Sequence, residues 1–424
     1  MNDNIATPFA KPLYVMLKPA GAHCNLACKY CYYLEKNHLY QNTPRHLMTD
    51  EMLEQFTREY IEAQTMPQVL FTWHGGEPLM RSIDFYKKAL ALQKKYAHGK
   101  QIDNVIQTNG TLLTDEWCEF FAKNHFLVGI SIDGPQEYHD HYRQTSAGKP
   151  SWEKVMHGIS LLKKHRVEWN AMAVVNAYNA EHPLEFYHFF RDNGCQYLQF
   201  TPIVERLTEH EDGRTLASLA DVSHEDNYED VGNAKKQKEN QEITIANFSV
   251  TPEQWGKFLC TIFDDWVRHD VGKIFVEIFD CTLANWVGVQ PGICAYSKEC
   301  GHAGVMEHNG DVFSCDHFVF PEYKLGNIQD KSLIDMLYGE KQQAFSRLKH
   351  TSLPRQCKEC DMEFACHGEC PKNRFENDKY GEPGLNYLCK GYYEYYTHVA
   401  PYMDFMKREL QAQRPPANIM NVLK

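Results

Sequence analysis

The placement of the cysteines limits what this chain can fold into more than any other feature. Cys24, Cys28 and Cys31 stand within one short segment, and eight more cysteines lie between Cys294 and Cys389. In a reducing compartment, clustered cysteines indicate metal or redox chemistry and not a disulfide framework. The segment after Asp280 is also rich in glycine and short loops, so we expect it to build little core of its own and to need bound metal for stability.

Length and charge narrow the class of protein. A chain of 424 residues is longer than most single cores, which predicts two domains. Hydrophobic residues make up 43%, enough for a globular protein. A net charge of -12 disfavours nucleic acid and anionic membranes as partners. Because the sequence shows neither a signal peptide nor an apolar run of about 20 residues, we expect a cytoplasmic protein that does not enter the membrane.

The first half alternates short apolar strands with amphipathic helices, the pattern of repeated βα units and a mostly parallel sheet. A helix over Thr49–Gln64, for example, opens with a threonine at its N-cap. Six units fall short of the eight of a closed barrel, so we predict a partial (βα)6 barrel with chemistry on the loops after the strands. The predicted strands are Leu13–Leu17, Val69–Trp73, Asn104–Gln107, Leu127–Ile132, Glu168–Val175 and Tyr197–Phe200.

The first cysteine loop directly follows the first predicted strand. A cubane iron–sulfur cluster uses four thiolates, so a loop with three would leave one iron open to an exogenous ligand. A structural zinc site is instead closed by four protein ligands. The alternative is therefore a zinc loop completed by His23 or by a distant residue.

The CxxxCxxC spacing, with Tyr30 before the last cysteine, resembles the signature of the radical S-adenosylmethionine (SAM) superfamily. The segment from His74 to Pro78, HGGEP, follows the second predicted strand and is similar to the family's GGEP segment, which contacts the SAM amino group. Thr108-Asn109-Gly110 and Ser131-Ile132-Asp133-Gly134 follow the third and fourth strands. All these loops would lie at the same end of a parallel sheet.

The resemblance implies that Tyr30, Gly76, Ser131, Arg143 and Leu198 line the SAM site. Arg143 could bind a carboxylate through its planar fork of donors. On chemistry alone, Arg143 could equally form a surface ion pair, and a leucine such as Leu198 on a buried strand needs no functional explanation.

The eight C-terminal cysteines are similar in arrangement to the SPASM extension of peptide-modifying radical SAM enzymes. The resemblance implies two auxiliary 4Fe-4S clusters, and hence three 4Fe-4S clusters in all, together with SAM. From this part of the sequence alone, a pair of zinc sites is an equal alternative. The resemblance assigns Cys294, Cys300, Cys315 and Cys370 to one cluster and Cys357, Cys360, Cys366 and Cys389 to the other. Cys118, Cys195, Cys260 and Cys281 fall outside the pattern and are expected to be buried small hydrophobes.

Domain bounds follow from these motifs. We predict a radical SAM partial barrel over residues 1–205 and a polar insert or linker over 206–250. Residues 251–424 would hold a linker helix and the SPASM domain. That helix is predicted over Thr251–His269, where apolar residues recur at helical spacing.

The whole assembly most resembles the anaerobic sulfatase-maturating enzymes, through CNLACKYCYYLEK, HGGEP, the SPASM spacing and Cys315-Asp316. The resemblance implies a radical SAM oxidoreductase that oxidises an active-site Cys or Ser of a sulfatase to Cα-formylglycine. A 5′-deoxyadenosyl radical would remove hydrogen from Cβ, chemistry that belongs to the cofactor. Asp316 would be the catalytic base, and a negative cluster beside it would raise its pKa. The alternative for Asp316 is a residue that caps a turn.

The expected partners are a sulfatase polypeptide in an unfolded or nascent segment and a low-potential electron donor such as flavodoxin or ferredoxin. We expect a monomer. One alternative is a SPASM peptide maturase that forms crosslinks in a ribosomal peptide. Such enzymes usually carry a separate peptide-recognition domain, for which the residues before Cys24 leave little room. The other alternative is an iron–sulfur or zinc protein that acts as a redox sensor or scaffold.

Overall fold

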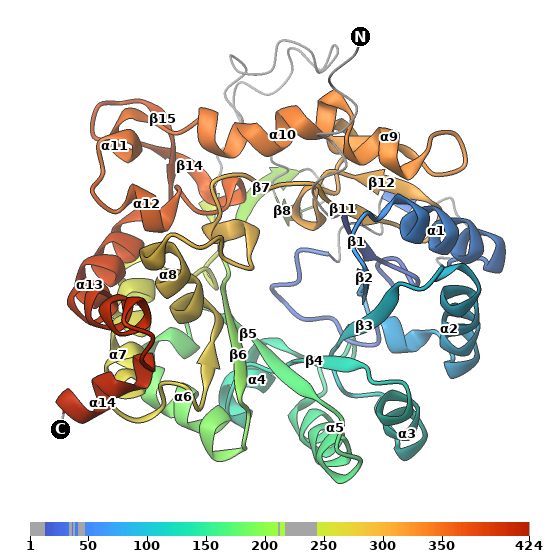
Figure 1. Ribbon diagram of the computed structural model, residues 1–424, viewed down its shortest axis with the longest axis horizontal. Helices are drawn as coiled ribbons and strands as arrows, with labels where there is room; N and C mark the ends of the chain where they lie inside the picture. The colour runs from blue at the N-terminus through green and yellow to red at the C-terminus, as the bar shows by residue number, and fades with distance from the viewer. Residues whose placement is uncertain are drawn as a thin grey trace. The chain divides into compact units, whose positions relative to one another are not determined.

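The fold is described from a computed structural model (Figure 1). The structure describes residues 13–33, 36, 39–40, 47–210, 213–216 and 244–423. Most of the predicted polar insert over 206–250 therefore lies outside the described residues. The described parts of that range include a small antiparallel sheet in the order β8-β7-β9, formed by β7 (Arg206–His210), β8 (Gly213–Leu216) and β9 (Thr244–Ile245).

All six predicted strands of the first half are present, and helices alternate with them. Strand pairing among them is parallel, which confirms the predicted α/β class with a mostly parallel sheet. The strands are β1 (Tyr14–Leu17), β2 (Gln68–Trp73), β3 (Gln101–Thr108), β4 (Leu127–Ser131), β5 (Trp169–Val175) and β6 (Tyr197–Pro202). The helices are α1 (Asp50–Ala63), α2 (Ile83–Tyr96), α3 (Asp115–Lys123), α4 (Gln136–Tyr142), α5 (Trp152–Lys164) and α6 (Pro183–Asp192).

Local capping explains where two of the predicted helices begin. The Thr49 side chain accepts a hydrogen bond from the backbone of Met52 and starts α1. Thr251 and Gln254 form a reciprocal capping box at the start of α7 (Pro252–His269). Both helices therefore begin where the sequence predicts, because these signals act within one turn of the chain.

The chain forms two compact units that do not follow sequence order. The first comprises residues 1–131, 140–169 and 301–346, and the second comprises 132–139, 170–300 and 347–424. The domain bounds predicted at 1–205, 206–250 and 251–424 stay a prediction.

The first unit holds β1 to β4 and three further strands from the C-terminal third. β1 pairs in parallel with β2 on one side and with β11 (Ala303–Met306) on the other, so that Leu17 lies between Trp73 and Met306. β12 (Asp311–Phe313) and β13 (Lys324–Asn327) continue the sheet in antiparallel fashion. The helices α9 (Leu333–Leu337) and α10 (Glu340–Thr351) follow.

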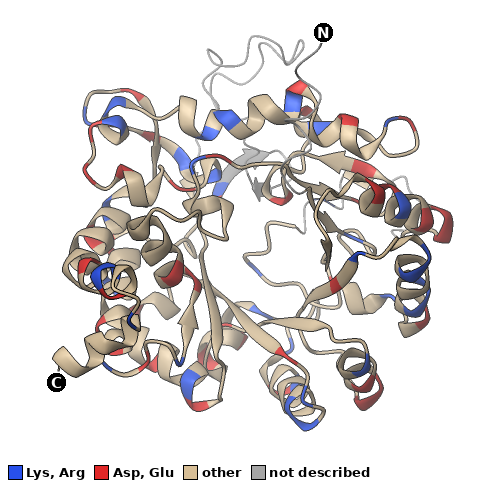
Figure 2. Ribbon diagram, in the orientation of Figure 1, with Lys and Arg blue, Asp and Glu red and all other residues tan. Residues whose placement is uncertain are grey.

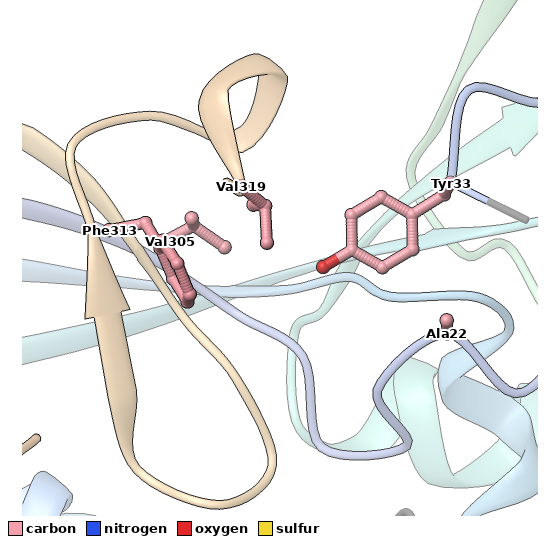
Figure 3. Close-up of a cluster of buried hydrophobic side chains, with 5 residues drawn as sticks. All are labelled: Ala22, Tyr33, Val305, Phe313 and Val319. Atoms are coloured by element: carbon pink, nitrogen blue, oxygen red, sulfur yellow. The ribbon is translucent and has the colours of Figure 1, made fainter. Parts of the chain in front are cut away.

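These added strands contribute core, contrary to the expectation that the chain after Asp280 builds little of its own. Val305 and Phe313 from β11 and β12 are buried with Val319, Ala22 and Tyr33 in one hydrophobic cluster. Figure 3 shows the five side chains, with the Tyr33 ring reaching in from the cysteine loop. Burying such side chains is worth about 1.5–3 kcal/mol each. Metal is thus not the only source of stability in this part of the chain.

The second unit holds a parallel sheet of β5, β6 and β10 (Phe275–Val276) and three long helices. Those helices are α7, α8 (Glu277–Val287) and α13 (Cys389–Gln411). α7 and α13 approach closely at Gly391, where a Cβ would lie 2.1 Å from the Pro252 carbonyl oxygen. The smaller elements are β14 (Arg374–Asn377), β15 (Pro383–Asn386), α11 (Arg355–Lys358), α12 (Glu363–Cys366) and α14 (Ile419–Val422).

The predicted apolar face of α7 is confirmed. The six residues that recur at helical spacing are all buried, namely Trp255, Phe258, Leu259, Ile262, Phe263 and Trp266. Burial of one such stripe, with polar residues elsewhere, is what fixes a helix against a core.

Acidic residues predominate along α1 and basic residues along α2 (Figure 2). Lys95 of α2 pairs with Glu54 of α1 at 2.7 Å, and Lys88 pairs with Asp50. Exposed pairs of this kind contribute about 0–1 kcal/mol each. Among the described helices, none combines the length and the apolar character needed to cross a bilayer.

Candidate active site

The first cysteine loop is attached to the HGGEP loop by backbone hydrogen bonds. The N–H of Gly76 donates to the Gly21 carbonyl at 2.7 Å, and the N–H of Glu77 donates to the His23 carbonyl at 2.8 Å. A Cβ at position 76 would lie 2.2 Å from that His23 oxygen, so only glycine fits. These bonds hold the HGGEP loop against residues 21–23, which directly precede Cys24.

The thiols of this loop are in surroundings that disfavour an uncompensated negative charge. Burial, followed by the charges of Glu77 and Cys31, raises the pKa of Cys24 to about 11, although Arg143 opposes the shift. The Cys24 sulfur accepts hydrogen bonds from the backbone of Leu26 at 3.4 Å and from Asn109 at 3.7 Å. A coordinated metal deprotonates a thiol outright, so these free thiols suit a bound cation better than a reactive nucleophile.

Glu77 is a residue of this site that the sequence did not single out. Its carboxylate is fully buried and accepts hydrogen bonds from Leu79 N at 2.9 Å, Thr108 Oγ1 at 2.7 Å and Asn109 N at 2.8 Å. Burial raises the pKa of Glu77 to about 7 although these hydrogen bonds oppose the shift. Glu77 thereby joins the loops after β2 and β3. The acidic residue in HGGEP and the hydroxyl in Thr108-Asn109-Gly110 were its only sequence signal.

Four of the residues predicted to contact SAM lie in the first unit. Arg143 Nη1 donates to the Tyr30 hydroxyl at 2.9 Å, and both residues are buried, which rules out the alternative of a surface ion pair for Arg143. Gln107 Nε2 donates to Ser131 Oγ at 2.9 Å. Leu198 belongs to β6 of the second unit and is buried. The role of these residues in SAM binding stays a prediction.

Asp316 is held by residues far from it in sequence. Lys18 Nζ lies 2.5 Å from a carboxylate oxygen of Asp316, and the Tyr32 hydroxyl donates to the other oxygen. Lys18 also lies 3.3 Å from His74 Nδ1 and 3.9 Å from the centre of the Tyr33 ring. Nothing in the sequence marks Lys18, because a single lysine after a strand is a common surface residue.

The charges around Asp316 decide the direction in which its pKa is shifted. Burial alone would raise the pKa of Asp316, but the charges of Lys18, His74 and His317 hold it below its ordinary value. The raised pKa expected for Asp316 concerns the protein with a negative cluster bound beside it, and it stays a prediction. His74 accepts at Nδ1 from the N–H of Gly75 at 2.8 Å, and burial, followed by the charge of Lys18, lowers its pKa to about 4. The neutral His74 ring therefore carries its proton on Nε2.

Seven of the eight remaining predicted cluster cysteines lie in the second unit and influence one another. Burial is the largest cause of the raised pKa of Cys370, and the charges of Cys294 and Cys300 add to it. In the same way, burial and then Cys357 and Cys360 raise the pKa of Cys389 to about 12.

Cys315 lies two residues after the end of β12 in the first unit. Burial is the largest cause of the raised pKa of Tyr32, and the charges of Cys315 and Cys31 add to it. The assignment of all eleven cysteines as cluster ligands stays a prediction. The cysteines outside the pattern behave as expected in three cases, since Cys118, Cys195 and Cys281 are buried, while Cys260 is half-buried.

The donor set fits iron–sulfur clusters chemically. Thiolates are the ligands that hold 4Fe-4S clusters, and the predicted ligands are all free cysteines. Within the described part of the chain, no three His, Cys, Asp or Glu side chains are arranged to hold a single metal ion.

Comparison with known proteins defines the family. Residues 19–190 match the model of the radical SAM superfamily, and residues 299–361 match that of the SPASM iron–sulfur cluster-binding domain. The chain is 67% identical over 424 residues to a serine-type anaerobic sulfatase-maturating enzyme of Bacteroides thetaiotaomicron, covering 100% of this chain and 98% of that protein. It is 29% identical over 393 residues to a cysteine-type enzyme of Clostridium perfringens, covering 92% and 97%.

A solved structure of native anSMEcpe, with bound AdoMet and Cp18Cys peptide, is also similar. It superposes with a TM-score of 0.77 at 28% identity and covers 94% of this chain and 100% of that one. The cysteine motifs, the parallel α/β fold and this full-length similarity agree: the chain is a radical SAM enzyme with a SPASM domain and belongs to the family of anaerobic sulfatase-maturating enzymes.

Proposed function

We propose that this enzyme oxidises a serine in the active-site segment of a sulfatase to Cα-formylglycine, with Asp316 as the base. The observation that carries the proposal is the ion pair of Lys18 and Asp316. Asp316 directly follows Cys315, a predicted cluster ligand. Serine as the target is supported by the relative at 67% identity, which is named serine-type, whereas the cysteine-type relative is 29% identical.

Three 4Fe-4S clusters and SAM are the proposed cofactors. Cys24, Cys28 and Cys31 would hold the cluster that binds SAM, while the other two take four cysteines each. When bound, these groups supply the radical that removes one hydrogen atom from the substrate Cβ and take up the one electron that the resulting radical must lose. The proposed ligands of the auxiliary clusters are Cys294, Cys300, Cys315 and Cys370 for one and Cys357, Cys360, Cys366 and Cys389 for the other.

The remaining product of the oxidation is the hydroxyl proton, and Asp316 would accept it. Lys18 keeps this carboxylate ionised and fixes one oxygen, and the Tyr32 hydroxyl fixes the other. A carboxylate has about four lone-pair positions, so a substrate hydroxyl can still bind. The ionised carboxylate is the form that can accept a proton, and the transfer is eased because a hydroxyl on a carbon radical is more acidic than an ordinary alcohol.

Arg143, Tyr30, Gly76, Ser131 and Leu198 are proposed to bind SAM. Arg143 and Tyr30 support this role as a buried, hydrogen-bonded pair, and the planar guanidinium is the side chain best suited to a carboxylate. Gly76 supports it through a close backbone approach that leaves no space for a side chain. Ser131 and Leu198 rest on the family resemblance.

The proposed protein substrate is an unfolded or nascent sulfatase segment, a view supported by the peptide bound in the similar structure. A flavodoxin or ferredoxin would deliver electrons. We further propose a cytoplasmic location, since a reducing compartment keeps the free cysteines available as ligands. We also propose that the enzyme is a monomer.

The decisive experiment uses anaerobically reconstituted protein with SAM, dithionite and sulfatase-motif peptides that differ only in Ser or Cys at the target. We expect about twelve irons, the sum of three four-iron clusters, 5′-deoxyadenosine, and an aldehyde product that forms faster from the Ser peptide. Deoxyadenosine without aldehyde would favour a crosslinking peptide maturase. Zinc without iron would refute the proposal.

A further inference from the structure

The loop between Cys366 and Cys370 has an unusual backbone. Three consecutive residues have positive φ: His367 at 48°, Gly368 at 67° and Glu369 at 53°. Residues other than glycine rarely adopt this conformation, and it persists only when surrounding contacts hold it. The loop joins a cysteine of one proposed auxiliary cluster to a cysteine of the other.

Arg374 supplies three of the hydrogen bonds that hold this loop. Its Nε donates to the Gly368 carbonyl at 2.8 Å, and its Nη2 donates to the carbonyls of His367 at 2.7 Å and Glu369 at 3.0 Å. One guanidinium therefore binds the carbonyl of every residue in the strained stretch. Its remaining nitrogen, Nη1, donates to the Lys349 carbonyl at 2.5 Å.

Lys349 continues the connection to a third cysteine segment. Its side chain is fully buried, and Nζ donates to the carbonyls of Ala295 at 2.6 Å, Ser297 at 2.5 Å and Cys294. These bonds use all three N–H groups of the ammonium. A buried lysine that binds three carbonyls within four residues of a cysteine loop fixes the path of that loop.

Both cations lie among the cysteines of the proposed clusters. Burial lowers the pKa of Lys349, and the charges of Cys300, Cys370 and Cys294 oppose that shift. Burial also lowers the pKa of Arg374, and there the charges of Cys366, Cys370 and Cys357 oppose the shift. Arg374 thus interacts with cysteines of both proposed sets.

We propose that Arg374 and Lys349 are positioning residues that hold the two auxiliary cysteine sets ready for cluster assembly and set the reduction potential of the clusters. The geometry supports the first role, since two side chains bind the loops that carry Cys294, Cys366 and Cys370. The second role follows because a cation beside a cluster stabilises its reduced, more negative state and raises its potential. The inference rests on the proposed division of the cysteines.

The test compares Arg374→Met, Arg374→Lys and Lys349→Met in a Cys24→Ala background, in which only auxiliary clusters assemble. The matched control is Arg355→Met, which removes an exposed arginine that pairs with Glu359 at 2.6 Å close to Cys357. Iron and sulfide are measured after reconstitution. Cluster potentials are measured by redox titration with electron paramagnetic resonance, and unfolding of each apoprotein is followed by circular dichroism.

We expect Arg374→Met and Lys349→Met to lose auxiliary iron, to lower the unfolding temperature of the apoprotein, and to shift the potential of any remaining cluster to more negative values. Arg374→Lys keeps the charge but not the planar fork, so it should lose iron while the potential of the remaining clusters stays near that of the parent. The control should match the parent in every measurement.

Parent iron content and potentials in Arg374→Met and Lys349→Met would overturn the inference. A Cys24→Ala parent that binds no iron would overturn it together with the proposed division of the cysteines. Aldehyde formation is not among the readouts, so failure of the proposed oxidation of serine would leave this test intact.

Discussion

The ammonium of Lys18 lies 2.5 Å from the carboxylate of Asp316, with the Lys18 side chain fully buried and that of Asp316 14% exposed. The two residues come from opposite parts of the sequence and meet because β11 and β12 pair beside β1. The proposed base is therefore held in place by a cation that follows the first strand.

Replacing Asp316 tests the base directly. Asp316→Asn should still cleave SAM but should lower aldehyde formation by about 10²-fold or more, because the amide cannot accept the hydroxyl proton. The ratio of aldehyde to 5′-deoxyadenosine, measured by mass spectrometry, separates the two steps. Asp330→Asn, an exposed residue of the same unit, is the control. An unchanged ratio in Asp316→Asn would exclude this role.

Replacing Lys18 tests how Asp316 is held. Lys18→Met should destabilise the protein by about 3–5 kcal/mol, because removing one partner leaves a buried charge uncompensated. Since the pKa of Asp316 is lowered by the pair, this stability is present at neutral pH and is lost as the pH falls through the acidic range. Denaturation at pH 7 and at about pH 2 measures both effects, and Lys18→Arg should recover part of the loss. Equal stability of the parent and Lys18→Met at pH 7 would show that the ion pair does not stabilise the protein.

The raised pKa of Glu77 leads us to expect the opposite pH dependence of stability. Because the pKa of Glu77 is raised to about 7, the folded state binds its proton more tightly than the unfolded state, and stability falls as the pH rises from about 5 to 8. A shift of this size corresponds to about 3 kcal/mol. Glu77→Gln should remove this slope, which urea denaturation of the apoprotein at several pH values would detect. The same slope in both proteins would show that Glu77 is ionised throughout.

Gly76 predicts a steric effect on the cysteine loop. In Gly76→Ala the new Cβ would lie 2.2 Å from the His23 carbonyl, so the two loops must separate. We expect a loss of about 1–3 kcal/mol and loss of SAM binding measured by equilibrium dialysis. Gly292→Ala, where a Cβ meets no atom within 4 Å, is the matched control. Tight SAM binding by Gly76→Ala would mean that this approach is not needed.

Replacing Cys24 should abolish all radical chemistry. Cys24→Ala removes one of three proposed ligands, so the open cluster should not form and deoxyadenosine should not appear. Cys118→Ala, at a buried cysteine outside the motif, should keep the chemistry with some loss of stability. Deoxyadenosine from Cys24→Ala would place the SAM cluster elsewhere.

The sequence by itself determined the features that depend on neighbouring residues. The six strands, the starts of α1 and α7 and the buried face of α7 follow from periodicity and capping, which act over one or two turns of the chain. The cysteine spacing likewise indicated the family, because three thiolates on one loop already constitute most of a cluster site.

Only the tertiary structure decided which distant residues meet. No local pattern connects Lys18 to Asp316, or places β11 beside β1, since these contacts depend on how whole elements pack. The effect of Lys18 and His74 on the pKa of Asp316 could not be predicted for the same reason, because a pKa responds to charges that are close in space whatever their distance in sequence. The hold of Arg374 on the loop after Cys366 is a further contact of this kind, fixed by side-chain geometry that spacing does not encode.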